Sequence, residues 1–332
     1  MTSEQKEGAP AERGLRPVSY SELNTFRQCP MKWELGYKKG YKPKREKEAF
    51  RLGHIWHEMM QVHYGVIKEY QDAEGDGNVL RTEQLLEWCA REVGGVLDKT
   101  DETTRELMNW AYAGYVEVYG CDPQWRILAI EIRGQVELTP GSGIQIVYVI
   151  DLVVEDSDYG GIWIIDHKFP GDLASDTEIE LDDQLGLYWG CWIIDAVNNP
   201  DGLIKRVNGA MLNEARKKRN VGDLPDNQRG TFKSGKLKGT PQTLDQRFRR
   251  SRTSRTDSEA LTIAQDAARV VKAMIVLDAN DLLYSSPDPK QCGWKCDFDE
   301  VHILSRSSEI PLEEILSDFG FQSRAEREAE GE

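Results

Sequence analysis

The chain has 332 residues, of which 39% are hydrophobic, and a formal net charge of −15. This length can bury a substantial core in one large or two modest domains, and the acidic balance argues against indiscriminate nucleic-acid binding. Six cysteines are too few for a disulfide scaffold, and no apolar run approaches the roughly 20 residues that a membrane span needs. We therefore expect a cytoplasmic protein with reduced thiols and no membrane partner.

The first part of the chain predicts a tail followed by helices. Residues 1–16 are polar and predict a disordered tail. The pattern SYSE, which begins at Ser19, has capping-box spacing and predicts a helix that the Cys29-Pro30 step interrupts. Periodic apolar residues predict further helices over 50–70, about 82–97 and 101–119.

Alternating apolar residues then predict a strand over 125–138 and a hairpin over 144–168. Asp151, Asp166 and Lys168 lie within these apolar runs, where an isolated buried charge would be costly. Side chains alternate along a strand, so Asp166 and Lys168 share a face, and a turn near 159–161 would bring Asp151 close to them. Two carboxylates and a lysine on a rigid sheet predict a site for a hard divalent cation and a water.

One further acid belongs to the strand before this hairpin. Glu131 either faces the same site or pairs with a basic neighbour, and we favour the pairing.

The second half of the chain predicts another helix, a strand and a basic insertion. The helix covers 178–197 and carries Gln184 and Tyr188 on one face. The strand covers 204–212, and the insertion, at about 213–255, is either flexible or ordered by a ligand. Lys205 to Arg255 contains 15 basic residues and four acidic ones, so positive charge is concentrated here. A helix over 257–283, a loop rich in proline and a charged tail over 313–332 complete the chain.

Four motifs in this order, GHIWH, VID, DHK and QLGLY, resemble the RecB-like branch of the PD-(D/E)XK nuclease superfamily. The sequence looks closest to the single-domain exonucleases of phages and of CRISPR adaptation and to the AddB nuclease domain. The resemblance implies an α/β fold with a restriction-endonuclease-like core, in which helices flank a central mixed sheet. It implies a nuclease domain over 17–312, which contains the basic insertion.

The resemblance also implies roles for residues that match the family motifs. His57, Asp151 and Asp166 match the ligands of Mg²⁺ or Mn²⁺, and Lys168 matches the lysine that positions the attacking water. A general-base role for Lys168 would require burial to lower its pKa. Gln184 and Tyr188 match the helix motif beside the site. The sequence departs from the family at Tyr148, where relatives often have glycine.

A second site is implied by the cysteines, because many relatives hold an iron–sulfur cluster with one N-terminal and three C-terminal cysteines. Cys29, Cys292 and Cys296 match three of these positions, whereas His302 stands at the fourth. Three thiolates and one imidazole could hold a 4Fe-4S cluster or a structural zinc ion, or could have lost the metal. An occupied site would join the N- and C-terminal segments.

We therefore expect a metal-dependent DNA exonuclease that acts on single-stranded or frayed DNA in prokaryotic or phage recombination or repair. Recombination or single-strand-binding proteins are further candidate partners, and some relatives form oligomeric rings. One alternative is a non-catalytic nucleic-acid-binding or recombination-partner module on a nuclease fold. The other alternative is a structure-specific endonuclease.

Overall fold

A six-stranded mixed sheet is built around the hairpin that the sequence predicts. The computed structural model describes residues 16–73, 81–199, 206–217, 238–239, 247–253, 255–288, 292–293 and 296–330. The strand order is β1-β4-β5-β6-β7, and β3 pairs with β4. The strands are β1 (Val18–Ser19), β3 (Trp125–Glu137), β4 (Gln145–Asp156), β5 (Ile162–Lys168), β6 (Gly209–Ala215) and β7 (Phe248–Arg252).

The register of the sheet determines which side chains lie next to one another. β4 and β5 are antiparallel, with Leu152 opposite Ile165 as the last ladder pair before the site. Their turn contains Gly160 and Gly161, whose φ angles of 72° and 80° are readily accessible to glycine. β5 runs parallel to β6, which pairs in turn with β7 in the antiparallel sense. Lys168 therefore lies beside Glu214.

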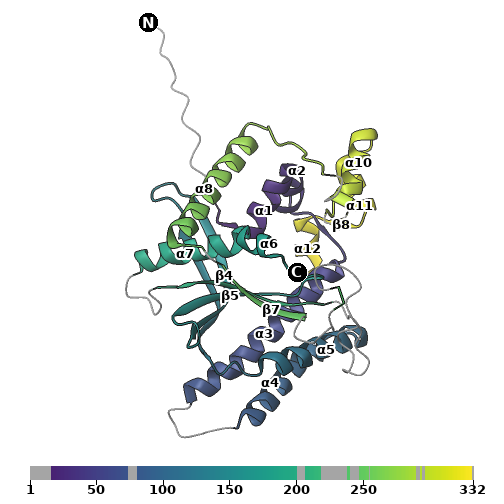
Figure 1. Ribbon diagram of the computed structural model, residues 1–332. Helices are drawn as coiled ribbons and strands as arrows, with labels where there is room; N and C mark the ends of the chain where they lie inside the picture. Colours follow the sequence, from purple (N-terminus) through teal and green to yellow (C-terminus); the bar gives the residue numbers. More distant parts are fainter. Residues whose placement is uncertain are drawn as a thin grey trace.

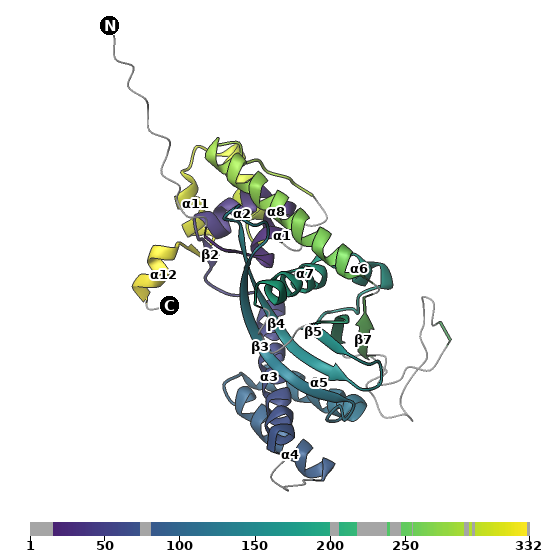
Figure 2. The same cartoon turned by 90° about the vertical axis from the view of Figure 1, so that its left-hand side faces the viewer.

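Helices cover both faces of the sheet, as expected for an α/β fold (Figure 1). One face packs against α1 (Tyr20–Gln28), α7 (Asp183–Asn198) and α8 (Asp257–Ala279). The other face packs against α3 (Glu48–Ala73), α4 (Thr82–Leu97) and α5 (Glu102–Tyr119). Figure 2 shows α7 and α8 on the opposite side of the sheet from α3. The mixed sheet and its flanking helices confirm the predicted architecture.

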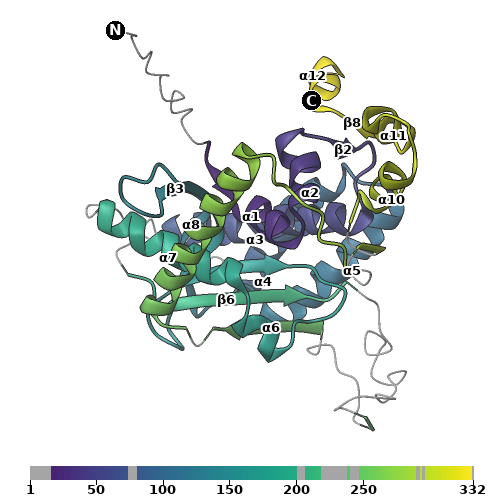
Figure 3. The same ribbon diagram turned by 90° about the horizontal axis from the view of Figure 1, so that it is seen from above.

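Segments from the two ends of the chain lie side by side (Figure 3). Leu35 packs with Phe298, Leu316 and Phe321 in a small separate core, and β2 pairs with β8. The elements of these end segments are α2 (Pro30–Trp33), a π-helix (Glu34–Lys38), β2 (Lys42–Pro43), α10 (Asp299–Ser307), α11 (Leu312–Asp318), β8 (Phe321–Gln322) and α12 (Arg324–Glu330). The short helix α6 (Asp176–Glu180) lies elsewhere, between β5 and α7 in the chain. Residues 312–322, which composition assigned largely to a charged tail, thus contribute buried side chains.

Three further sequence predictions differ from the structure. The single helix expected over 178–197 is two helices, because Asp182 caps α7 by accepting a hydrogen bond from Leu185 N. The strand expected over 204–212 is β6, which begins at Gly209 and ends at Ala215. The expected insertion at 213–255 begins inside β6 and contains β7, while residues 218–237 and 240–246 lie outside the described part. In the described ranges, no helix is long and apolar enough to cross a membrane.

Candidate active site

A cleft of about 990 Å³ opens between the two helical layers at the end of β5. Six residues predicted from the sequence line it, and they come from four elements. They are His57 on α3, Asp151 on β4, Asp166 and Lys168 on β5, and Gln184 and Tyr188 on α7. The fold thus brings together side chains that lie more than 100 residues apart in sequence.

Asp151 is held from two sides by hydrogen bonds to a single carboxylate oxygen. Its Oδ2 lies 3.1 Å from His57 Nδ1 and accepts the backbone N–H of His167 at 2.7 Å. Burial alone would raise the pKa of Asp151, but the hydrogen bond and charge of His57 outweigh it and lower the pKa. Burial opposes the charged form of His57 as well, yet Asp151 raises the pKa of the imidazole above its ordinary value. The two groups therefore stabilise each other's charged forms.

Asp166 is the more deeply buried of the two acids, and burial is the main cause that raises its pKa to about 6. Lys168 opposes this shift, whereas the neighbouring charge of Asp151 adds to it. Lys168 Nζ lies 2.7 Å from Asp166 Oδ2, and Asp166 raises the lysine pKa despite the opposing effect of burial. Asp166 thus favours the charged form of Lys168, which counts against a general-base role.

Gln184 joins the lysine to both an acid and a tyrosine. Its Oε1 accepts a hydrogen bond from Lys168 Nζ at 3.1 Å. Its Nε2 donates to Asp166 Oδ1 at 3.4 Å and to Tyr188 OH at 3.2 Å. Burial raises the pKa of Tyr188, so its hydroxyl stays protonated. Gln184 can thus orient the ammonium and the carboxylate together.

The donor set suits a hard cation, although it is not arranged as a complete coordination shell. Asp166 Oδ2 is buried and lies 2.7 Å from Lys168 Nζ, and the carboxylate of Asp151 is close enough to raise the pKa of Asp166 further. A divalent cation would neutralise the two neighbouring carboxylates of Asp151 and Asp166, and carboxylate oxygens suit Mg²⁺ or Mn²⁺. Within the described ranges, no three His, Cys, Asp or Glu side chains form a ready-made metal-binding group.

Two further acids line the cleft, and sequence patterns did not assign them to it. Glu131 lies in the cleft, where burial and the charge of Asp151 raise its pKa; no ion pair with a basic neighbour is seen among the described residues. Its φ of 50° is unusual for a non-glycine residue within a strand. Glu214 is buried and accepts hydrogen bonds from Ala174 N at 2.8 Å and Arg249 Nη2 at 3.0 Å. The sequence signal that could have identified Glu214 was a charged residue within an otherwise apolar strand.

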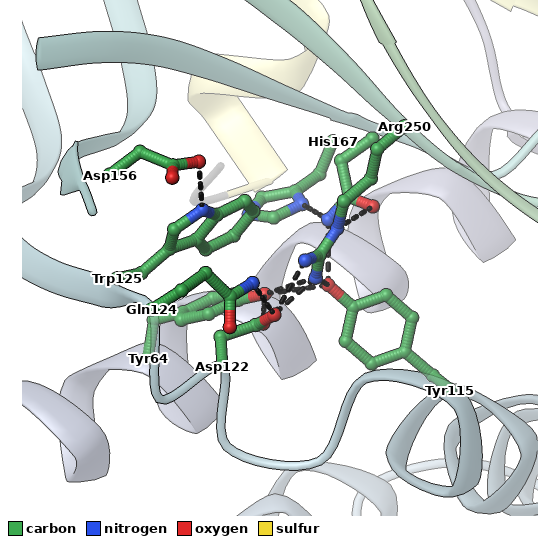
Figure 4. Close-up of polar contacts among 9 residues, drawn as sticks. Tyr64, Tyr115, Asp122, Gln124, Trp125, Asp156, His167 and Arg250 are labelled. Carbon is green, nitrogen blue, oxygen red and sulfur yellow. Dashed lines mark hydrogen bonds and ion pairs between the residues drawn. The ribbon is translucent and has the colours of Figure 1, made fainter. Parts of the chain in front are cut away.

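A buried polar network supports the site from the opposite face of the sheet (Figure 4). Arg250 pairs with Asp122 at 2.5 Å and donates to Tyr115 OH at 3.0 Å. Asn213 contacts both Tyr115 OH and His167 Nδ1, at 2.7 and 2.9 Å. Because the backbone of His167 donates to Asp151, this network fixes the strand that orients the carboxylate.

The four residues predicted for a cysteine-based site line a different cavity, of about 340 Å³. Cys29, Cys292 and Cys296 are free thiols there. His302 Nε2 is buried and, in the described part of the chain, has no hydrogen-bond partner. These residues meet at the junction of the N- and C-terminal segments, but they do not form a ready-made metal-binding group either. The donor chemistry fits a thiolate-bound metal.

Comparison with known protein families identifies a family that covers most of the chain. A family model described as the PD-(D/E)XK nuclease superfamily matches residues 17–301. A comparison with curated proteins finds no match. The matched region contains all six predicted residues of the cleft.

Proposed function

The chain belongs to the PD-(D/E)XK nuclease superfamily, and we propose that it is a metal-dependent DNA exonuclease with the cleft as its active site. The observation that carries the proposal is the meeting of one imidazole, two carboxylates and one ammonium in this cleft. The buried carboxylate of Asp166, which lies near the charge of Asp151, supports a cation as an additional partner of the two acids.

The assigned roles follow from charge and position. His57, Asp151 and Asp166 would hold Mg²⁺ or Mn²⁺, which supplies charge neutralisation at the phosphate and lowers the pKa of a water. The Lys168 ammonium would position the attacking water and stabilise negative charge as the oxygen–phosphorus bond to the leaving group breaks. Gln184, with Tyr188 behind it, would hold Lys168 in place.

Single-stranded or frayed DNA is the substrate that we propose, in prokaryotic or phage recombination or repair. Arginines at the β7 edge, including Arg249 beside the buried Glu214, support contact with a phosphate backbone. Recombination or single-strand-binding proteins remain proposed partners, and the cytoplasm remains the proposed location.

We also propose that Cys29, Cys292, Cys296 and His302 hold a 4Fe-4S cluster that joins the chain ends. Their common cavity and the buried Nε2 of His302 support this assignment. Anaerobic purification with iron, sulfide and zinc analysis tests it. Iron and sulfide in equal amounts in the wild-type protein, together with their loss in Cys292→Ser, would support the cluster. Zinc alone would indicate a structural zinc site instead, and the absence of any metal would contradict both assignments.

The activity is tested with end-labelled single-stranded and duplex DNA and with closed circular DNA, each with Mg²⁺ or Mn²⁺. We expect short products from an end, and no products with Asp166→Ala. Cuts in closed circles would instead indicate an endonuclease. DNA binding without any cleavage, unchanged by Asp166→Ala, would indicate a binding module.

A further inference from the structure

A second groove, of about 760 Å³, lies beside the edge strand β7. Its lining includes Tyr159, Trp163, Arg252 and Thr253, and we call it the β7 groove. Side chains alternate along β7, so Arg252 points to the opposite face from Arg249, which pairs with Glu214 of the catalytic cleft. The two hollows share one edge strand, and Arg249 lies at their boundary because it lines the β7 groove and pairs with Glu214.

Arg252 is held against aromatic rings and has no ion pair within the described ranges. Its guanidinium carbon lies 3.5 Å from the centroid of the Tyr159 ring and 5.5 Å from that of Trp163. A guanidinium that stacks through its flat face keeps its in-plane N–H groups for an anion. Such groups bind phosphate oxygens with two parallel hydrogen bonds.

Thr253 offers an independent sign that the β7 groove accepts a polar ligand. The residue is only 7% exposed, and among the described residues nothing forms a hydrogen bond with its buried Oγ1. Its backbone N–H donates to Ala210 O at 3.0 Å, which fixes the position of the residue. Buried hydroxyl groups normally have partners, so a ligand oxygen is a natural one.

Tyr159 presents an aromatic surface at the mouth of the β7 groove, where the residue is 59% exposed. Asp156, itself buried, anchors the turn by accepting hydrogen bonds from the backbone N–H groups of Asp158 and Tyr159 and from Trp125 Nε1. The carboxylate of Asp156 is therefore buried and engaged by these hydrogen bonds. One face of the Tyr159 ring contacts Arg252, and the other can stack on a base.

We propose that the β7 groove binds single-stranded DNA outside the catalytic cleft. Arg252 and Thr253 contact a phosphate, and the adjacent base stacks on Tyr159. The inference rests on the proposed nuclease function. Arg249 lines the β7 groove while it pairs with Glu214 of the cleft, so it marks the boundary that a strand would cross. Asp166 and Ser251 are separated by two strand spacings, about 10 Å, a span that a short oligonucleotide can cover.

The test is binding of fluorescent oligothymidylates without divalent cations, from a dinucleotide to about 16 nucleotides. We expect Tyr159→Ala and Arg252→Ala each to weaken binding of the longest oligonucleotide by about tenfold. Arg252→Ala should also reduce the salt dependence by close to one phosphate contact. Tyr284→Ala is the matched control, because Tyr284 is 57% exposed but lies outside the groove.

Thr253→Val separates ligand binding from a role in folding. It removes an unpartnered hydroxyl while keeping the shape, so thermal stability should be kept or increased while DNA affinity falls. Unchanged affinity in all three groove variants would overturn the proposal while leaving nuclease activity intact. If the wild-type protein neither cleaves nor binds DNA, the proposed function fails together with this inference. Competition by inorganic phosphate alone, with no dependence on oligonucleotide length, would indicate a free-anion site and also overturn it.

Discussion

The ring of Tyr148 on β4 occupies the space in which a side chain on Gly134 would begin. A Cβ on Gly134 would lie 2.1 Å from Tyr148 Cζ, and the two residues are paired across the strands. Tyr148 OH donates to Asp195 Oδ2 at 2.9 Å, which fixes the ring. The bulky residue three positions before Asp151 is therefore accommodated by a glycine on the neighbouring strand.

Gly134→Ala is expected to destabilise the protein by about 1–3 kcal/mol, because the added methyl group forces the fixed ring of Tyr148 to move. Urea unfolding measures the effect. In the control Gly94→Ala, the new methyl group meets no atom within 4 Å on helix α4, so stability should be unchanged or higher. The double variant Gly134→Ala/Tyr148→Leu should cost less than the sum of its single variants.

Lys168→Met should reduce kcat by about 10²- to 10⁴-fold, because the ammonium beside Asp166 is lost from the cleft. Gln184→Ala should have a smaller effect, about 10- to 100-fold, since Gln184 orients Lys168 through one hydrogen bond. Steady-state rates on end-labelled DNA give both values. An equal reduction of kcat in the two variants would contradict the assignment of Lys168 as a catalytic residue and Gln184 as a positioning residue.

Mn²⁺ should stabilise the wild-type protein by about 2.7 kcal/mol at one hundred times its dissociation constant. Asp166→Asn should abolish this gain, because it removes the charge of the buried carboxylate while keeping its size. Thermal unfolding with and without Mn²⁺ is the measurement. Asp172→Asn, at a residue that also lines the cleft but pairs with Arg216, is the matched control and should retain the gain.

Arg250→Met should cost about 3–5 kcal/mol, because it leaves the carboxylate of Asp122 buried without its ion-pair partner. The double variant Arg250→Met/Asp122→Asn should cost at least about 1 kcal/mol less than the two single variants together. Chemical denaturation of the wild type, the two single variants and the double variant gives the four free energies of unfolding that this double-mutant cycle requires. The exposed pair of Arg126 and Glu155, at 3.8 Å, serves as control, and Arg126→Ala should change stability by less than about 1 kcal/mol.

Acid should destabilise the protein partly through His63, which is fully buried on α3. Burial lowers the pKa of His63 from 6.5 to about 4, so the folded state favours the neutral imidazole. Its contribution to stability is complete above pH 6.5 and is lost as the pH falls toward 4.

His63→Phe removes this titration and should reduce the loss of stability between pH 7 and 5 by on the order of 2 kcal/mol. Urea unfolding at several pH values measures this loss. Identical pH profiles for His63→Phe and wild type would show that the buried imidazole does not contribute.

Periodicity was enough to predict the hairpin and the long helices, because each buries a regular face. The sequence pattern did not predict β7, because its arginines are typical of an exposed segment and not of a strand with buried side chains. Arg250 lies 3.6 Å from the Tyr119 ring centroid and is neutralised by Asp122, contacts that the sequence pattern does not reveal. The break before α7 was missed because it depends on a cap by Asp182 within an otherwise continuous helical pattern.

The pairing of β6 with β7 has a practical consequence for the long segment between them. Arg216 N donates to Arg247 O at 2.9 Å, so the segment leaves and re-enters the sheet at adjacent positions. Closing a longer loop between fixed ends adds only slowly to the entropy cost of folding. Chains of different length could therefore join Lys217 to Arg247 at a similar entropy cost, because the sheet fixes both ends.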